Sequence, residues 1–212
     1  MLFSSSLSEN ISELGEKAKK ANPDGYYNML KDAVEAGKFE ATAVATTNYN
    51  GLIADILERD DITYLNVGTS VWYAPYLNKI GTEEELQDDE HHIIVPLIFT
   101  QSGTKPMTAI SMSVKYVDLY RAWKDSDAIV VVGFGFGADD EHINVILRTL
   151  VNDDGKELII VTKGNNPGAI TRQKARALKI SDASKIKVIA VGDDGKSNGK
   201  RWGELLDDGE TP

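Results

Sequence analysis

The sequence of 212 residues contains no cysteine, only three histidines and no long apolar run. Without cysteine the chain has no thiolate catalysis, iron–sulfur cluster, cysteine-ligated zinc or disulfide. The longest apolar stretch near its middle, Ile93 to Phe99, is far shorter than the roughly 20 residues that a membrane-spanning helix needs. No basic region followed by an apolar segment marks a secretory signal at the N-terminus, so we expect a cytoplasmic protein.

Basic residues are also in the minority, because 23 Lys and Arg stand against 33 Asp and Glu and give a net charge of −10. This balance argues against nucleic-acid binding, which needs clustered Lys and Arg. One segment, here called the basic segment, has the opposite sign and is either a solvated helix face or a surface for an anion or a partner. It contains Asp182 and the cations Arg172, Lys174, Arg176, Lys179, Lys185 and Lys187. A block of six acids at 83–90 is expected in an exposed loop or a frayed helix.

The histidines do not predict a metal site. His91 and His92 are adjacent, and adjacent side chains of a strand point to opposite faces. His142 follows Asp139 by one helical turn, which is a possible ligand spacing, but a helix cap explains it more simply. No Ser-His-Asp order or Walker loop is apparent either. We therefore expect no metal.

The composition, with 42% hydrophobic and 26% charged residues, is that of a globular protein, and the length favours one domain over residues 1–212. Residues 1–38 predict a preface of two amphipathic helices. Strand-like runs and helical patterns then alternate. The predicted strands are 41–47, 62–67, 93–99, 128–132, 158–162 and 186–191, and the predicted helices between them are 52–57, 116–123, 141–150 and 169–178.

Several of these strands are continuously apolar, as in Ile129–Val132 and Leu158–Val161. Such runs are typical of strands that are covered on both faces. We therefore predict a three-layer, Rossmann-like α/β fold with a mainly parallel sheet and helices on both faces. The tail 192–212 is expected to be partly ordered, with Trp202 and Leu205-Leu206 docking it.

A glycine-rich segment follows the strand predicted over 128–132. This segment, the glycine turn, comprises Gly133, Phe134, Gly135, Phe136 and Gly137. Its first two glycines and Ala138 have the G-x-G-x-x-A spacing of a dinucleotide-binding turn, in which the backbone approaches a pyrophosphate. The acids at 139–141, and Lys163 where a ribose-binding acid is usual, weaken this pattern. The turn is either nucleotide-facing or a plain strand-to-helix connection, and its phenylalanines either flank an adenine or belong to the core.

A second polar turn follows the strand predicted over 41–47. This asparagine turn comprises Thr46, Thr47, Asn48, Tyr49 and Asn50. Ligands collect beyond the carboxyl ends of parallel strands, so we expect the two turns to lie side by side and to contact one small molecule. Taken alone, Asn48 or Asn50 is most simply a helix cap.

The two turns resemble those of the sirtuin-like NAD-binding family, in its bacterial form without a zinc module. The asparagine turn is similar to that family's Thr-Gln-Asn-Ile-Asp or Thr-Thr-Asn-Tyr-Asp turn. The glycine turn, followed by Asp-Asp-Glu-His-Ile at 139–143, is similar to its second nucleotide-side turn, and the resemblance covers about residues 39–162.

This resemblance implies NAD or a related nucleotide as the cofactor, and cleavage of the nicotinamide glycosidic bond by an NAD hydrolase or a deacylase. It places Asn48 near the nicotinamide ribose, Asn50 near the carboxamide and the glycine turn on the adenosine side. Asn48 is therefore the predicted catalytic residue, and the predicted cofactor contacts are Thr46, Thr47, Asn50, Gly133, Phe134, Gly135 and Gly137.

Three departures from the family pattern limit this implication. The family's Gly-Ala-Gly turn, which cradles the pyrophosphate, is missing from residues 1–40. Where the family has Leu-His-Gly, residues 65–70 read Leu-Asn-Val-Gly-Thr-Ser, so the catalytic histidine is missing too. Asn50 stands where the family has an acid. The missing turn and histidine argue against a deacylase.

Three functions stay open. The leading one is a sirtuin-like NAD- or nucleotide-binding domain that is catalytically degenerate or is the C-terminal part of a larger protein. The second is an NAD glycohydrolase that another chain completes, as a homo-oligomer or with a partner protein, with Asn48 orienting the attacking water. The third is a non-catalytic interaction module whose basic segment recruits an acidic partner. None of them involves nucleic acid or a membrane.

Overall fold

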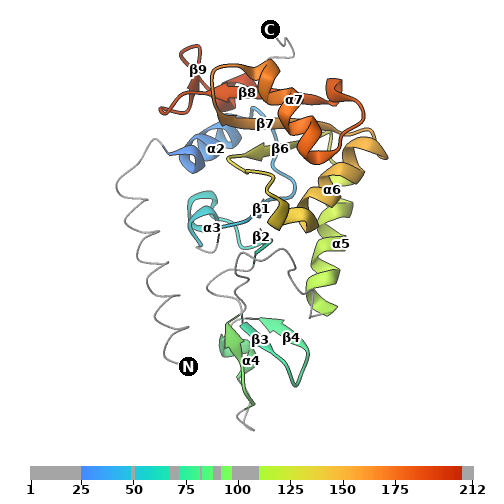
Figure 1. Cartoon of the computed structure of the whole chain (residues 1–212). Coiled ribbons are helices and arrows are strands. Elements are labelled where there is room, and N and C mark those ends of the chain that lie inside the picture. The colour runs from blue at the N-terminus through green and yellow to red at the C-terminus, as the bar shows by residue number, and fades with distance from the viewer. Residues whose placement is uncertain are drawn as a thin grey trace. The chain divides into compact units, whose positions relative to one another are not determined.

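The structure is a computed structural model that describes residues 25–48, 51–66, 72–81, 83–87, 92–96 and 110–206 (Figure 1). The chain splits into two compact units. Unit 1 comprises Met1–Pro23 and Ala43–Leu119, and unit 2 comprises Asp24–Thr42 and Tyr120–Pro212. Each unit is described by itself, so a single domain over 1–212 stays a prediction.

Unit 2 is built on a parallel sheet of three strands in the order β6-β7-β8. The strands are β6 (Ala128–Val132), β7 (Glu157–Lys163) and β8 (Ile186–Val191). Their register pairs Val132 with Val161 and Val161 with Ile189. All three strands lie where the sequence predicts them. The continuous apolar runs belong to β6 and β7, because a strand with both faces covered needs apolar residues at successive positions.

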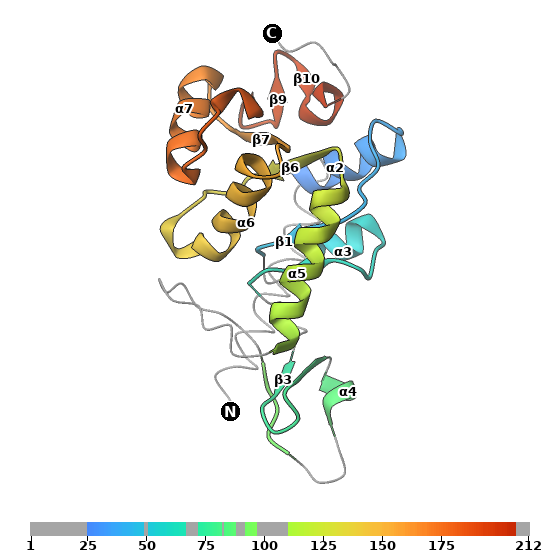
Figure 2. The ribbon, with the colours of Figure 1, turned by 90° about the vertical axis from the view of Figure 1, so that its right-hand side faces the viewer.

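Helical elements cover both faces of this sheet. On one face, Met29 of α2 (Tyr26–Glu35) and Trp202 of η3 (Trp202–Leu205) pack into a cluster with Ile159, Val161, Ile189 and Val191. Leu158 and Ile160 alternate with the β7 members of this cluster, point to the opposite face and are fully buried. Helices α6 (Glu141–Asn152) and α7 (Pro167–Leu178) lie side by side on that opposite face (Figure 2). The predicted three-layer α/β fold with a mainly parallel sheet is therefore confirmed.

Helices α6 and α7 follow from local sequence signals. The buried residues of α6 recur at helical spacing and are Ile143, Asn144, Leu147, Leu150 and Val151. Helix α7 begins after Asn166, whose side chain accepts a hydrogen bond from the Ala169 amide at 2.9 Å, with Pro167 at the first helical position.

The C-terminal end of α7 is completed by α6. Arg148 donates from Nε to the carbonyl oxygen of Leu178 at 2.7 Å, and Asn152 donates from Nδ2 to that of Lys179 at 3.1 Å. Carbonyls at a helix end have no partner within the helix, so these side chains supply the missing donors. They fix α7 against α6.

The two ends of the described chain meet in unit 2. The strands β9 (Lys196–Ser197) and β10 (Lys200–Arg201) form a hairpin that leads into η3, where Trp202 is only 1% exposed. Leu205 and Leu206 pack against the same cluster. The predicted docking of the tail through these side chains is therefore confirmed, while residues 207–212 and residues 1–24 of the predicted helical preface lie outside the described residues.

Unit 1 contains a parallel strand pair and a small antiparallel sheet. Strands β1 (Ala45–Thr46) and β2 (Thr63–Tyr64) are parallel, with α3 (Leu52–Leu57) between them in sequence. The antiparallel sheet has the order β4-β3-β5, formed by β3 (Trp72–Ala74), β4 (Lys79–Gly81) and β5 (Val95–Pro96).

The antiparallel sheet corrects one expectation. The sequence predicted 93–99 as one strand of a mainly parallel sheet, but β5, its described part, belongs to a separate small sheet and pairs antiparallel with β3. The reason is the β3–β4 hairpin, whose turn contains Asn78 at a φ of 48° and leaves one edge of β3 free to pair. Of the acidic block, which was expected in an exposed loop or a frayed helix, residues 83–85 form the exposed start of the short helix α4 (Glu83–Leu86). Residues 88–90 lie outside the described residues.

Helix α5 (Ile110–Asp125) runs from unit 1 into unit 2 and buries Tyr116 and Leu119. In the described part of the chain, no helix combines the length and the apolar character that crossing a membrane requires. The cytoplasmic location stays a prediction.

Candidate functional site

The glycine turn leaves the carboxyl end of β6 and leads through η1 (Ala138–Asp140) into α6. Gly133 has a φ of 68°, a left-handed conformation that favours glycine, and its amide donates to the carbonyl oxygen of Val161 at 3.0 Å. A side chain built at Gly133, Gly135 or Gly137 would find no atom within 4 Å of its Cβ. The backbone of the turn is therefore open to close approach by a ligand.

Side chains from α6 and α7 hold the carbonyl groups of this turn. Asn144 donates from Nδ2 to the carbonyl oxygen of Gly137 at 2.9 Å, and Lys174 donates from Nζ to that of Gly135 at 3.2 Å. Phe136 is buried with a φ of 59°, and its ring contacts that of Phe134 edge-on, with 4.9 Å between the ring centroids. Phe136 thus belongs to the core and anchors the turn.

The amides of the same turn are unused. Within the described ranges, the backbone N–H groups of Phe134, Gly135, Phe136 and Gly137 donate no hydrogen bond. A turn whose carbonyls are tied to side chains and whose amides are available presents donors to its surroundings. Such a surface suits an anion or the acceptor atoms of a ligand.

The charges near the turn partly offset one another. Glu141 at the start of α6 is paired with Arg148, 2.8 Å from oxygen to nitrogen, and this hydrogen bond lowers the pKa of Glu141. Lys174 brings a positive charge to the turn, and burial lowers its pKa. Asp139 and Asp140 belong to η1, which directly precedes Glu141 in the chain. Of the acids at 139–141, Glu141 is therefore compensated by an ion pair with Arg148.

The next strand end carries an ion pair instead of a ribose-binding acid. Lys163 at the end of β7 lies 2.8 Å from Asp193, which follows β8, and the hydrogen bond from Lys163 lowers the pKa of Asp193. Both side chains are exposed. A nucleotide at this edge would therefore be held differently from one in the common dinucleotide fold.

The described part of the asparagine turn, residues 46–48, lies in unit 1 at the carboxyl end of β1. Thr46 is buried, and its hydroxyl oxygen accepts a hydrogen bond from the Asn48 amide at 3.1 Å. Asn66, also buried, donates from Nδ2 to the carbonyl oxygen of Thr47 at 3.2 Å. The turn is thus fixed by its own threonine and by a side chain that follows the neighbouring strand.

The helix-cap interpretation is wrong for Asn48. Helix α3 has Gly51 as its N-cap residue, and no side chain caps it. Asn48 therefore lies three residues before the cap. Asn50 lies outside the described residues. The cap interpretation of Asp139 is wrong as well, because neither η1 nor α6 has a side-chain cap.

Each unit thus assembles one of the two predicted turns. The structure brings Thr46, Thr47 and Asn48 together with Asn66, and it brings the glycine turn together with Asn144 and Lys174. The expected side-by-side placement of the two turns stays a prediction, because they belong to different units.

Sequence reasoning did not assign Asn66, Asn144 or Lys174 to a turn. For Asn144 a signal was present, since it is an amide at an apolar position of the α6 pattern. Asn66 directly follows a short strand, which is a weaker signal. Lys174 was counted only as one charge of the basic segment.

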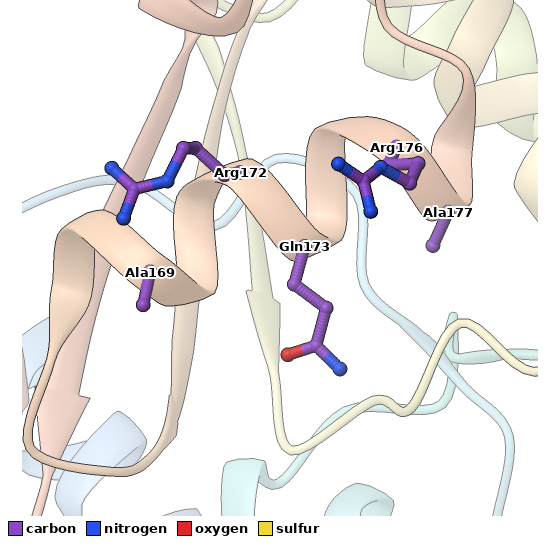
Figure 3. Close-up of a pocket in the computed structure, with 5 residues that line it drawn as sticks. All are labelled: Ala169, Arg172, Gln173, Arg176 and Ala177. Atoms are coloured by element: carbon purple, nitrogen blue, oxygen red, sulfur yellow. The ribbon is translucent and has the colours of Figure 1, made fainter.

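The basic segment does not form one face. Arg172 and Arg176 are exposed on α7, where they line a surface hollow with Ala169, Gln173 and Ala177 (Figure 3). Lys174 on the same helix instead reaches the glycine turn. Lys179 and Lys185 are exposed as well, and an interaction module built on the basic segment stays a prediction. Across the described ranges, no group of three or more His, Asp or Glu residues is placed to hold a metal ion.

Comparison with known proteins gives a likeness of fold. No protein-family model matches the chain, and no curated protein matches it in sequence. A solved structure described as "Sir2 bound to acetylated peptide" matches with a TM-score of 0.40 and 21% sequence identity. The match covers 66% of this chain and 59% of that chain, so this chain spans less than two thirds of its length. This is a partial likeness of fold to that Sir2 structure, and the resemblance to the sirtuin-like family rests on the two turns of the sequence.

Proposed function

We propose that unit 2 binds a nucleotide, NAD or a relative of it, at the glycine turn. The observation that carries this proposal is that the four backbone amides from Phe134 to Gly137 donate no hydrogen bond within the described residues. The space beside the glycines is open, and the carbonyls of Gly135 and Gly137 already accept hydrogen bonds from side chains. The phosphates and ring nitrogens of a nucleotide are acceptors for such amides. NAD is the nucleotide that the family resemblance implies.

A second feature of the turn supports a ligand with donors as well. Asn144 is 2% exposed, and its Oδ1 has no hydrogen-bond donor within the described residues. The bond from its Nδ2 to Gly137 fixes the orientation of the amide, so Oδ1 is a buried acceptor beside the turn. Leaving a buried acceptor unpaired is unfavourable, and a ribose hydroxyl or an ordered water supplies the donor.

Two contacts of the usual dinucleotide site are absent from this sequence, and this lowers the affinity that we expect. With Lys163 in place of a ribose-binding acid, and with the Gly-Ala-Gly turn missing from the sequence, we expect a dissociation constant near 1 mM, about −4 kcal/mol. At ten times that concentration the ligand stabilises the folded state by about 1.4 kcal/mol.

Calorimetric titration and thermal unfolding of the whole chain, each with NAD and with ADP-ribose up to millimolar concentration, test the proposal. We expect saturable heat and a rise in the unfolding temperature with both ligands. Neither heat nor a thermal shift at 10 mM would refute nucleotide binding.

We propose, second, that the asparagine turn takes part in hydrolysis of the nicotinamide glycosidic bond, with Asn48 orienting the attacking water. The observation that favours this role is that Asn48 does not cap α3, although its turn is fixed by Thr46 and Asn66. Thr46, Thr47 and Asn50 are the neighbouring contacts that the resemblance implies. Another copy or a partner chain supplies the phosphate contacts missing from residues 1–40.

Nicotinamide release from NAD tests this second proposal. We expect Asn48→Ala to lower the rate at least tenfold, and Asn165→Ala, which changes an exposed asparagine after β7, to leave it within twofold. Completion by a second copy predicts that the rate per chain rises with protein concentration. Equal rates for wild type and Asn48→Ala at every concentration would contradict the role of Asn48.

A further inference from the structure

Lys174 reaches out of α7 to the glycine turn. Its Nζ lies 3.2 Å from the carbonyl oxygen of Gly135 and 4.8 Å from the centroid of the Phe136 ring. The side chain is half-buried, and desolvation lowers its pKa from the ordinary value for lysine. A cation is thus held at the turn by a neutral carbonyl and an aromatic face.

Lys174 has no carboxylate partner among the described residues, and it is half-buried, whereas Arg172 and Arg176 on the same helix are exposed. The paired cations of this unit include Lys124 with Asp154, Arg148 with Glu141, Lys163 with Asp193 and Arg201 with Asp32. A partly desolvated ammonium group without an anion is less favourable than one that is paired. An anion bound at the turn would therefore stabilise the ammonium group of Lys174.

The turn supplies the other half of an anion site. The amides from Phe134 to Gly137 donate no hydrogen bond in the part of the chain that the structure describes. Several backbone amides together with one lysine form a common recognition pattern for phosphate oxygens, in which the amides give direction and the lysine gives charge. The carboxylate of Glu141, which follows the turn, repels an approaching anion only weakly, because Arg148 already pairs with it.

We infer that Lys174 is a phosphate-binding residue, and that the ligand of the glycine turn is recognised through a phosphate group rather than through its nucleoside alone. This inference rests on the proposed nucleotide binding and names its chemistry. On binding, Nζ exchanges the carbonyl oxygen of Gly135 for a phosphate oxygen of a nucleoside diphosphate. The family resemblance by itself assigns no lysine to this role.

The test compares ADP with adenosine on the whole chain, by calorimetry or by NMR titration at constant ionic strength. We expect wild type to bind ADP at least tenfold more tightly than adenosine. Lys174→Met keeps the aliphatic stem and removes the charge. We expect it to lower ADP affinity about tenfold and to leave adenosine affinity within twofold. Lys174→Arg keeps the charge and should retain most of the preference for ADP.

Lys185→Met is the matched control, because it removes the same charge from an exposed lysine of the basic segment. It should change neither affinity by more than twofold.

Equal losses for ADP and adenosine in Lys174→Met would show that Lys174 only holds the turn, and no loss for either would also overturn the inference. If wild type binds neither compound, the proposed nucleotide binding itself fails, which is a different result from an altered preference. Should Lys174→Met not fold, Lys174→Gln replaces it, and unchanged unfolding temperatures identify the usable variant.

Discussion

Replacing Trp202 with alanine is expected to destabilise unit 2 by about 3–5 kcal/mol, because truncating a buried aromatic residue removes its packing and leaves a cavity. Trp202 is the largest of the fully buried side chains among the described residues, and it packs in one cluster with Met29 of α2 and with residues of β7 and β8. Domains are stable by about 5–15 kcal/mol in total, so this one change removes a large share of that stability.

The indole is expected to contribute more than the ion pair near it, because that ion pair is exposed and weak. Asp32 of α2 pairs with Arg201 at 2.6 Å, but both side chains are more than one third exposed. Exposed ion pairs contribute at most about 1 kcal/mol. Burial of Met29 and Trp202 therefore holds α2 on the sheet, and α2 should detach when the indole is lost.

Urea unfolding followed by circular dichroism measures the effect, with two control variants. Within the described residues, Nε1 of Trp202 has no hydrogen-bond partner, so Trp202→Phe removes no bond and should cost less than about 2 kcal/mol. Val145→Ala shortens an exposed residue of α6 and should change stability by less than about 0.5 kcal/mol. A loss of under 1 kcal/mol for Trp202→Ala would show that the cluster does not hold α2.

The elements of unit 2 could be predicted because their signals are local. The run Leu158–Val161 is continuously apolar, and Asn166-Pro167 gives both the cap and the first residue of α7. Each signal involves residues that are neighbours in the chain. Strand and helix positions therefore follow from the sequence to within a few residues.

The packing of α2 on the C-terminal part of the chain could not be predicted in the same way. Asp32 and Arg201 are 169 residues apart, and an amphipathic pattern shows that a helix buries one face without showing against what. The same holds in the site: the glycine turn is visible in the sequence, but the lysine that holds it comes from 39 residues further along. Local patterns predicted where the turns are, and tertiary contacts decide which side chains meet them.

A carboxylate placed in the glycine turn is expected to abolish nucleotide binding without unfolding the protein. In Gly135→Asp, the new side chain enters open space, because no atom lies within 4 Å of a Cβ at this position, and Gly135 does not have a positive φ. Its carboxylate accepts hydrogen bonds from the unused amides nearby and takes the place of the ligand's phosphate. It also repels any phosphate that approaches.

Gly135→Asn separates this effect of charge from the effect of size, since asparagine fills the same space without the charge. We expect Gly135→Asp to lower the affinity for ADP-ribose at least tenfold relative to Gly135→Asn, with the difference shrinking as salt screens the repulsion. Asn198→Asp adds the same charge in the β9–β10 turn, where asparagine already has a φ of 51°, and should leave affinity within twofold. Calorimetry gives the affinities, and thermal unfolding checks that all three variants stay folded. Equal affinities for Gly135→Asp and Gly135→Asn would mean that the amides of the turn do not face an anionic ligand, and the site would then have to lie elsewhere.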